Sequence, residues 1–590
     1  MHVFVDHERL TLKDSDLVGE GGEARVYRHR NAALKLFHPA TDALSRRLLD
    51  LKLTKLKHFP TALPPEVVAP LKLARDDGQR VVGYLMPLVK GAEDFGRLAS
   101  RKWRAGTLPN DAVMALFRAL HGVVVGLHAR GVVVGDLNDG NVLFSGPRPY
   151  LIDADSMQFG GFPCPVGHER YLDPKLYGVD LTTAPRFDEG TDWYAFSVLL
   201  FSSLLFVHPF GGMHATLPTA LRRAEARHSI YRSDVTLPRL ASTPKVLPDD
   251  LSHHFLAVFE KDVRSPFPER LLHLPWTTCT CGLEHARAVC PECHALGPLV
   301  TRQVLRTKGR CTARTAFETS GRILAASLQG GLRYVFEEKG VVRREDGAVV
   351  LPHAAAPGMR FGISGPSTWV ANASGQVLRV ENGQVVERAS TDVRLTTPVL
   401  AVASSVTYRQ EQGWLIEQRT GARVGQSLEG QTWLWTGERL GLGFYRAGGL
   451  TVAFLLRTGK PGLKHLHGVT WTGRIVEADA SFDAQHALLT VVTEAQGREV
   501  VRRWLFDEAG ALLGRSEGGS PGHAALLGGR VVLATDGGLV GLKRDSGHLL
   551  EAVQFPDTQD FVSAGDELLP NTDGSLFVVG ARDITQLSLT

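Results

Sequence analysis

The chain has 590 residues, of which 43% are hydrophobic and 22% are charged, a composition typical of a soluble globular protein with several domains. The net charge of +4 is small for this length, and the sequence predicts neither a nucleic-acid partner nor a membrane partner. The start, MHVFVDHERL, lacks the pattern of a signal peptide, and four of the six cysteines lie close together, so we expect a reducing, cytoplasmic location.

A glycine-rich hairpin is predicted near the N-terminus, in VGEGGEARVYRHRNAALKLF. Gly19 and Gly21 lie between two strand-like runs, and Val26 completes a G-x-G-x-x-A-x-V pattern. Two glycines let a hairpin close over phosphate groups, and the valine that follows can cover an adenine ring. The next strand, AALKLF, holds Lys35 among apolar neighbours, where an ammonium group is costly unless it meets an anion.

Two acids and one amide lie beside apolar, strand-like runs farther along. Asp136 and Asn141 occur in VVVGDLNDGNVLF, and Asp153 occurs in YLIDADSMQF. Such side chains cost desolvation energy beside a core unless something binds them, and Mg²⁺ with nucleotide phosphates is the candidate. The apolar run WYAFSVLLFSSLLFV is 15 residues long, too short to span a membrane, and predicts a buried core helix.

Residues 276–296 form a short Cys/His segment that predicts a structural zinc site with protein ligands only. The candidate ligands are Cys279, Cys281, His285, Cys290 and Cys293. A redox role for the C-x-x-C pair is the alternative. Cys164 and Cys311 are predicted to be ordinary buried thiols.

The last part of the chain is predicted to be a repeat of β-hairpins. Residues 297–315 contain the basic stretch TRQVLRTKGRCTAR and are interpreted as an exposed linker, with an anion site as the alternative. From residue 316 to 590, short strands alternate with turns, and a repeated glycine falls at 331, 375, 413, 449, 497, 537 and 574. A period near 40 predicts a β-propeller of seven blades, in which each glycine supplies the positive-φ residue of a hairpin. A pair of β-sandwiches is the alternative. We expect the propeller to present loops to a partner, without a catalytic site of its own.

Taken in order, the N-terminal motifs resemble those of the protein kinases. GEGGEARV resembles the glycine-rich loop, Lys35 the phosphate-binding lysine, and GYLMPLV the strand and hinge that hold adenine. VGDLNDGN resembles the catalytic loop, and IDADS takes the place of the Asp-Phe-Gly motif. TDWYAF resembles the start of the helix whose aspartate, here Asp192, ties down the catalytic loop, and HPFGG matches the turn after it.

This resemblance implies a bilobal α+β kinase domain over residues 1–275, with an N-lobe at 1–88 and a C-lobe at 89–275. It implies that Asp136 orients the acceptor hydroxyl and that Lys35 holds the phosphates of ATP. The residues that it assigns to the nucleotide are Gly19, Gly21, Val26, Lys35, Met86, Leu88, Asn141 and Asp153. Asn141 and Asp153 are also the implied ligands of Mg²⁺, or of Mn²⁺ in its place.

A narrower resemblance lies in DADSMQFGGFPCPVGHERYLDPKLYG. This run is similar to one in bacterial kinases found with von Willebrand A-domain proteins and metal-dependent phosphatases in tellurite- and stress-response clusters. A Trp and a zinc element often follow in that group, as Trp276 and the Cys/His segment do here. The implied zinc ligands are Cys281, His285, Cys290 and Cys293, with Cys279 in place of His285 as the variant. The implied partners are a protein substrate, a von Willebrand A-domain protein and a phosphatase.

The sequence also departs from the kinase pattern. Val134 and Gly135 replace the usual His and Arg, so control by phosphorylation of the activation loop is not expected. The helix after Lys35 has no Glu to pair with that lysine, which leaves Asp50 as the first substitute and Asp42 as its competitor. Asp155 replaces the usual Gly and is a candidate metal ligand or loop stabiliser.

Three functions are therefore carried forward. The first is an ATP-dependent Ser/Thr-type protein kinase whose propeller docks a partner or substrate. The second is a pseudokinase scaffold that binds nucleotide for structural reasons and acts through the propeller. The third is a small-molecule kinase, because GDLNDGN also resembles a loop of the aminoglycoside- and choline-type kinases.

Overall fold

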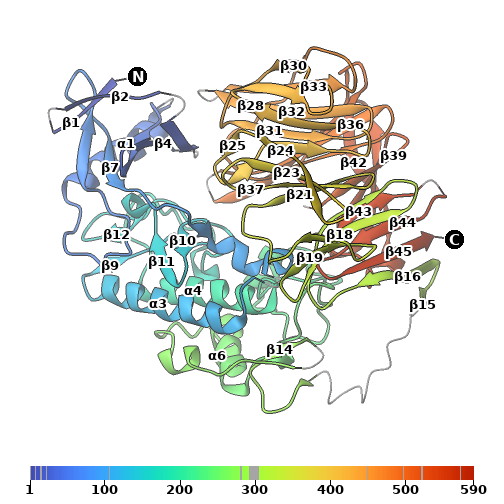
Figure 1. The fold of residues 1–590 in the computed structure, drawn as a ribbon. Coiled ribbons are helices and arrows are strands. Elements are labelled where there is room, and N and C mark those ends of the chain that lie inside the picture. The colour runs from blue at the N-terminus through green and yellow to red at the C-terminus, as the bar shows by residue number, and fades with distance from the viewer. Residues whose placement is uncertain are drawn as a thin grey trace. The chain divides into compact units, whose positions relative to one another are not determined.

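The computed structural model describes residues 2–6, 8–13, 16–20, 23–40, 42–104, 107–279, 282–291, 305–447, 450–495, 497–519, 522–571 and 573–589. Over these residues the chain is multidomain and mostly β. One compact unit comprises residues 1–300 and 495–498, and the other comprises residues 301–494 and 499–590. The described α-helices all belong to the first unit (Figure 1): α1 (Ala43–Lys57), α2 (Arg101–Arg104), α3 (Asn110–His128), α4 (Glu189–Leu205), α5 (Ala220–Glu225) and α6 (Asp249–Glu260).

The first unit begins with a seven-stranded antiparallel sheet. Its strands are β1 (His2–Val5), β2 (Glu8–Thr11), β3 (Leu17–Glu20), β4 (Ala24–His29), β5 (Ala32–Phe37), β6 (Lys72–Arg75) and β7 (Val81–Pro87), in the order β2-β1-β6-β7-β5-β4-β3. Helix α1 contacts β7 and begins at Asp42, whose side chain accepts from the backbone N–H of Ser45. Asp42 is thus used as a helix cap, which satisfies a backbone donor at the helix start.

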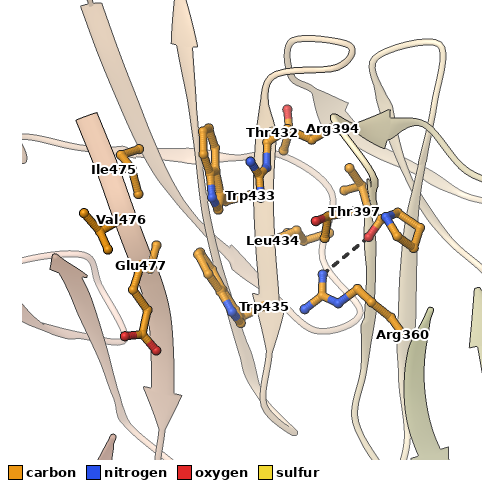
Figure 2. Close-up of a pocket in the computed structure, with 13 residues that line it drawn as sticks. Arg360, Arg394, Thr397, Thr432, Trp433, Leu434, Trp435, Ile475, Val476 and Glu477 are labelled. Atoms are coloured by element: carbon orange, nitrogen blue, oxygen red, sulfur yellow. Dashed lines mark hydrogen bonds between the residues drawn. The ribbon is translucent and has the colours of Figure 1, made fainter. Parts of the chain in front are cut away.

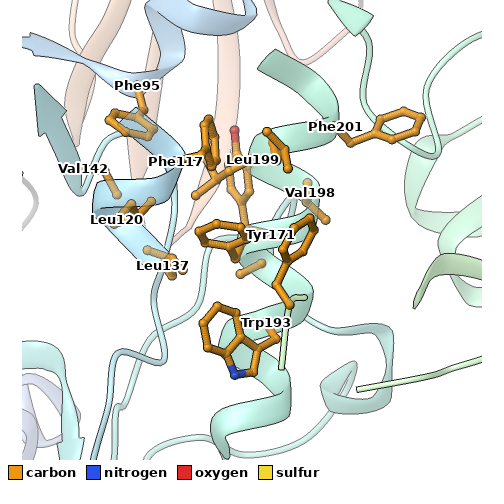
Figure 3. Packing of buried hydrophobic residues seen from close by; sticks show 14 of the residues in the cluster. Phe95, Phe117, Leu120, Leu137, Val142, Tyr171, Trp193, Val198, Leu199 and Phe201 are labelled. Atoms are coloured by element: carbon orange, nitrogen blue, oxygen red, sulfur yellow. The ribbon is translucent and has the colours of Figure 1, made fainter. Parts of the chain in front are cut away.

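The rest of the first unit is built around α3 and α4. Both helices are rich in large apolar residues, and their side chains meet in one core (Figure 3). The same core includes Trp276. Residues 193–205 of the predicted apolar run are all buried in α4, which confirms the prediction of a core helix. Helix α3 is the one described helix that is long and apolar enough to cross a membrane. Half of its most apolar window is buried, which is consistent with a soluble protein.

Short strands carry the loops between these helices. They are β8 (Glu93–Asp94), β9 (Val132–Val133), β10 (Val142–Ser145), β11 (Arg148–Leu151) and β12 (Gln158–Phe159), followed near the end of the unit by β13 (Thr277–Thr278) and β14 (Glu284–His285). β10 pairs with β8 and β11, and β9 pairs with β12. The loops that hold Asp136, Asn141 and Asp153 therefore begin or end at paired strands.

The second unit consists of successive antiparallel sheets. Four of them have four strands each. The first two sheets are β17 (Arg322–Leu328), β18 (Leu332–Glu338), β19 (Val341–Arg344) and β20 (Val349–Leu351), then β21 (Arg360–Ser364), β22 (Ser367–Ala371), β23 (Gln376–Glu381) and β24 (Gln384–Ser390). The next two are β27 (Leu400–Val402), β28 (Thr407–Glu411), β29 (Trp414–Glu417) and β30 (Arg423–Gln426), then β31 (Thr432–Thr436), β32 (Leu440–Ala447), β33 (Leu450–Arg457) and β34 (Lys464–Leu466). A two-stranded hairpin, β25 (Val393–Arg394) and β26 (Thr397–Pro398), lies between the second and third sheets in the chain.

An eight-stranded sheet follows, made of two four-stranded halves that share one parallel pair, Arg515 with His548. The halves are β35 (Arg474–Phe482), β36 (His486–Ala495), β37 (Arg498–Asp507) and β38 (Leu512–Glu517), then β39 (Ala524–Leu527), β40 (Arg530–Thr535), β41 (Gly538–Asp545) and β42 (His548–Phe555). The last sheet joins β43 (Glu567–Pro570), β44 (Leu576–Val579) and β45 (Asp583–Leu589) to β16 (Cys311–Glu318) and β15 (Leu305–Lys308).

Seven edge strands of these sheets form a closed ring of contacts, and we call them the ring strands. Strands β17, β21, β27, β31, β35, β39 and β43 each contact the next, and β43 contacts β17. Strand β16 from the start of the unit pairs along β45 at its end, from Cys311 with Leu589 to Glu318 with Asp583. The prediction of an exposed linker over 297–315 is therefore wrong for residues 305–308 and 311–315, which form strands, while residues 297–304 lie outside the described part.

The predicted role of the repeated glycines holds in part. Gly375, Gly413, Gly497 and Gly574 have positive φ, as the hairpin pattern predicts. At two other repeats the prediction is one residue off, because the positive φ belongs to Gly330 (68°) and Gly538 (100°) rather than to their neighbours Gly331 and Gly537. In a Gly-Gly pair either residue can adopt the left-handed conformation, so sequence spacing alone does not choose between them. Gly449 lies outside the described residues.

Candidate active site

The loop after β9 holds two of the predicted site residues in a fixed geometry. Asn141 Nδ2 donates to Asp136 Oδ2 at 3.1 Å and to the Asp136 carbonyl at 3.0 Å. The other carboxylate oxygen of Asp136 accepts from the backbone N–H of His168 at 2.9 Å. The Asp136 carboxylate is therefore oriented from both sides, by the loop itself and by the segment that follows Asp153.

A buried aspartate at the start of α4 ties this loop down. Asp192 is fully buried, and its carboxylate accepts from the backbone N–H groups of Val134 at 2.7 Å and Gly135 at 2.8 Å. His128 Nε2 contacts the same carboxylate at 2.8 Å. Charge-assisted hydrogen bonds of this kind are strong in a buried setting, so the loop conformation depends on Asp192.

Asp153 and Asn141 are brought together by the backbone. The N–H of Ile152 donates to the carbonyl of Asn141 at 3.0 Å, which sets the residue before Asp153 beside Asn141. Asp153 has φ 57° and ψ 34°, in the left-handed region. Its side chain is 46% exposed, so its carboxylate remains accessible. The Asn141 amide nitrogen is used by Asp136, which leaves the amide oxygen as the group suited to a cation. The two side chains thus fit the oxygen donor set that Mg²⁺ prefers.

Lys35 pairs with the segment that holds Asp153 and with no acid of α1. Its Nζ lies 3.1 Å from Asp153 Oδ1 and 2.7 Å from Asp155 Oδ1. The prediction that Asp50 or Asp42 replaces the missing Glu is therefore wrong, because Asp50 is on the exposed side of α1 and Asp42 caps that helix. Asp155 is 1% exposed and supplies the buried carboxylate instead.

Helix α1 contributes a lysine at this point where a kinase-like pattern would place an acid. Lys52 Nζ lies 3.4 Å from Asp155 Oδ2 and also pairs with Glu23 of the glycine-rich hairpin. Tyr84 donates its hydroxyl to Asp155 Oδ1 at 2.6 Å. Asp155 thus joins β5, β7 and α1 through three side chains. We call the set Lys35, Lys52, Tyr84 and Asp155 the Asp155 network.

The opposite charges in this network favour the ionised forms of Asp155 and Lys35. Burial acts to raise the pKa of Asp155, but Lys35 and Lys52 outweigh it and hold the pKa far below the usual range. Burial acts to lower the pKa of Lys35, but the carboxylates of Asp153 and Asp155 hold it well above the usual value. Burial, aided by Asp155, raises the pKa of the Tyr84 hydroxyl, which stays a donor.

A second lysine of α1 fixes the segment after Asp155. Lys55 is 1% exposed and donates to the carbonyls of Ser156 at 2.8 Å and Pro163 at 3.0 Å. Burial lowers its pKa to about 8. Sequence reasoning missed both Lys52 and Lys55, although a signal existed. They are three residues apart on α1 and alternate with Leu53 and Leu56, so they lie on the buried stripe of the helix.

The residues predicted to hold adenine form one apolar cluster. Val26, Met86 and Leu88 pack with Ala33, and Met86 pairs directly across from Ala33 in the sheet. Gly19 in β3 pairs with Val26 in β4, which sets the glycine-rich hairpin at the edge of the same sheet. Gly21 lies outside the described residues.

The Cys/His segment brings three of its candidate ligands together. One ligand atom from each of Cys279, His285 and Cys290 lies within 4.8 Å of the others, and His285 and Cys290 are buried. Two thiols and an imidazole are ligands suited to zinc, so these residues fit a structural site. Cys281 and Cys293 lie outside the described residues. Cys164 and Cys311 are buried thiols, as predicted, and burial raises the pKa of Cys164 to about 12.

A further group, which sequence reasoning did not single out, joins His214, His228 and Asp234. Each histidine directs Nε2 to an Asp234 oxygen, at 3.2 and 2.8 Å. His214 Nδ1 accepts the backbone N–H of Leu217 at 3.0 Å, so the neutral ring carries its proton on Nε2 and donates it to Asp234. This arrangement is a hydrogen-bonded cluster, because the His214 Nε2 lone pair that a metal would need is used by a proton.

A scan against protein-family models and a search of curated proteins found no match for this chain. Its function is therefore inferred from the geometry of the site.

Proposed function

We propose that this protein is an ATP-dependent protein kinase of the Ser/Thr type. The observation that carries the proposal is the convergence of four residues from separate parts of the chain. Lys35 contacts Asp153, the backbone joins Asn141 to the residue before Asp153, and Asn141 contacts Asp136. Lys35 is a cation suited to phosphate, Asn141 and Asp153 are suited to a metal ion, and Asp136 is a base. Phosphoryl transfer needs these groups close together.

Each side chain has one role in this proposal. Lys35 binds the phosphates of ATP, and Val26, Met86 and Leu88 cover the adenine. Asn141 and Asp153 hold Mg²⁺, which neutralises phosphate charge when it is bound. Asp136 orients an acceptor hydroxyl toward the γ-phosphorus and accepts its proton. A new bond forms between the hydroxyl oxygen and that phosphorus, the bond to the bridging oxygen breaks, and ADP leaves. The hydrogen bond from His168 N–H to Asp136 supports that orientation.

The other parts of the chain complete the proposal. We propose that the first unit has a bilobal kinase fold with a structural zinc site at Cys279–Cys293 and that the ring of sheets is a seven-bladed propeller that docks a partner or substrate. The resemblance of the sequence supports a cytoplasmic role in bacterial stress response, with a von Willebrand A-domain protein and a phosphatase as partners.

The pseudokinase scaffold remains the second candidate, and one observation favours it. Lys35 is neutralised by two carboxylates of the same segment, and Lys52 stands on α1 where an acid would be expected. A lysine held this way can bind nucleotide without reaching the geometry for transfer. A small-molecule kinase is the weaker third candidate, supported by the GDLNDGN loop alone.

The test is transfer of label from [γ-³²P]ATP by the full-length protein with Mg²⁺ or Mn²⁺, scored on itself and on a generic protein acceptor. Asp136→Ala and Asp153→Ala are each expected to lower the rate by about 100-fold or more. The matched control is Asp77→Ala, an exposed acid in the hairpin between β6 and β7, which should transfer at the normal rate. ATP that raises the melting temperature without any transfer would instead support the scaffold.

A further inference from the structure

The second unit contains a cavity of about 240 Å³ that lies among three of its ring strands and one hairpin. Its walls come from β21, the β25–β26 hairpin, β31 and β35. Figure 2 shows the guanidinium groups of Arg360 and Arg394 and the indole rings of Trp433 and Trp435 around the same space. The cavity is smaller than the roughly 300–1,000 Å³ typical of pockets for drug-sized ligands, so it suits a single side chain or small group.

Both arginines in this cavity are without a carboxylate partner among the described residues. The hydrogen bond of Arg360 goes to the carbonyl of Pro398, at a long 3.4 Å. Arg394 lies with its guanidinium carbon 3.9 Å from the centre of the Trp433 ring. Two half-buried cations that face one cavity without an ion pair to a described carboxylate are costly, and an anion bound between them would offset that cost.

The nearest acids on β35 are engaged elsewhere. Asp479 contacts His523 Nδ1 at 3.2 Å, and Glu477, at the exposed rim of the cavity, lies 4.0 Å from His523 Nε2. Neither forms an ion pair with Arg360 or Arg394. Burial lowers the pKa of Arg360 although the charge of Asp479 acts to raise it, and burial together with Arg360 lowers the pKa of Arg394 to about 10. Asp479 therefore offsets only part of the cost of burying these two cations.

The Arg394 guanidinium is also held in place before any ligand arrives. It covers one face of Trp433, and Phe444 stacks with Trp433 at 4.6 Å between ring centres and 22° between ring planes. A guanidinium stacked on an aromatic ring keeps its N–H donors in its own plane, directed away from the stack. Such a fixed donor loses little side-chain entropy when it binds an oxyanion.

We propose that this cavity binds one oxyanion, a phosphoryl or carboxylate group carried on a side chain of a protein segment, between Arg360 and Arg394. Bidentate contact from guanidinium groups is the preferred recognition of both oxyanions. The two tryptophans supply apolar walls for the carbon atoms that carry the charge. The identification of a protein as the carrier rests on the proposed docking role of the ring, whereas the anion site itself does not.

The test is calorimetric titration of the full-length protein, without ATP or added metal, with four probes. These are the peptide acetyl-Gly-Ala-pSer-Ala-Gly-amide, its Glu counterpart, its Ser counterpart and inorganic phosphate. We expect the phosphorylated or the Glu peptide to bind at least about tenfold more tightly than the Ser peptide, and the stronger of the two identifies the source of the oxyanion. Tighter binding of the peptide than of inorganic phosphate supports a protein carrier.

Variants locate the binding. Arg360→Gln and Arg394→Gln are each expected to weaken it by about tenfold or more, and Arg394→Lys by less, because the charge is kept. The control is Arg423→Gln, which also removes a guanidinium from a tryptophan, Trp414 at 5.0 Å, but lies outside the cavity. Equal binding of charged and Ser peptides, no binding of any probe, or equal losses in Arg423→Gln and the cavity variants would overturn the proposal. Kinase activity does not enter the assay, so a failure of the proposed kinase function leaves its result unchanged.

Discussion

The Lys35 ammonium lies 2.7 Å from the Asp155 carboxylate, closer than the 3.1 Å that separates it from Asp153. This contact places the buried partner of the phosphate-binding lysine two residues after the candidate metal ligand and leaves α1 to contribute a second cation. The position of α1 is thereby linked to the loop of Asp153 through a carboxylate that both lysines share.

Removal of Asp155 should destabilise the protein strongly. Asp155→Ala leaves Lys35 and Lys52, each with a side chain 5% exposed, without their shared carboxylate, and we expect the free energy of unfolding to fall by about 3 kcal/mol. Adding Lys52→Met should restore part of this loss, because it removes one of the two buried cations that lack Asp155 in the single variant. Urea denaturation measures both. Asp50→Ala, on the exposed side of the same helix, should change stability by less than about 0.5 kcal/mol. Similar losses at positions 50 and 155 would contradict the role given to Asp155.

Asp192 should control catalysis without touching the substrate. In Asp192→Asn one oxygen acceptor becomes an N–H donor that faces the N–H of Val134 or Gly135, so the loop of Asp136 is released. We expect kcat to fall by about 100-fold or more while the KM for ATP changes little, as measured by steady-state transfer. Glu189→Gln, in the first turn of the same helix and 59% exposed, serves as the control and should keep its kcat. A loss confined to KM would contradict this role.

The Cys/His segment should bind one zinc ion per chain. Cys290→Ser removes one of the three clustered ligand atoms, and we expect the zinc content, measured by elemental mass spectrometry, to fall from about one to less than half an ion per chain. Chelation should lower the melting temperature of the unaltered protein. Cys311→Ser, a buried thiol in the second unit, should keep its zinc. Full zinc content in Cys290→Ser would remove that residue from the ligand set.

Acid should destabilise the first unit through two half-buried histidines that stay neutral when folded. Burial, with Arg170 nearby, lowers the pKa of His208 from 6.5 to about 3, and burial lowers that of His254 to about 4. Well above pH 6.5 neither histidine is protonated, folded or unfolded, so neither adds a pH dependence. Between pH 6.5 and their folded pKa values the unfolded chain binds protons that the folded chain does not. Stability therefore falls as the pH falls, by about 2 kcal/mol per histidine at pH 5.

The variant His208→Gln isolates this effect. The free energy of unfolding, measured between pH 5 and 7, should lose less on acidification in His208→Gln than in the unaltered protein. His273→Gln, at a histidine whose side chain is 58% exposed, should follow the unaltered protein. Parallel curves for all three proteins would show that His208 is not the titrating group.

The parts of the site that depend on local sequence could be predicted, and those that depend on burial could not. Asp136 and Asn141 are five residues apart on one loop, so their contact is set by a short segment. Asp155 meets Lys52 across 103 residues. The resemblance suggested an acid on α1, and a buried lysine there was not expected because lysines are rarely buried. The pair is possible only because each side chain supplies the counter-charge of the other, a condition that the sequence does not display.

The same contrast holds in the second unit. The glycine spacing predicted repeated hairpins of the right period, because each hairpin is local. The prediction of a linker is wrong for residues 311–315 of β16, because the partner strand β45 lies at the other end of the unit and Arg314 and Cys311 carry no sign of that pairing. The contact of Arg394 with Trp433 was also missed, since Arg394 lies in the β25–β26 hairpin and Trp433 lies in the sheet that begins with β31.

The pairing of β16 with β45 has a consequence during synthesis. Residues 311–318 are among the first of the second unit to leave the ribosome, but their partner at 583–589 is among the last. Until that partner emerges, one edge of β16 is unpaired. The ring of strands also stays open, because the contact between β43 and β17 has not formed. The nascent ring is therefore an open, edge-exposed intermediate for nearly its whole translation, while the first unit, apart from residues 495–498, is already complete.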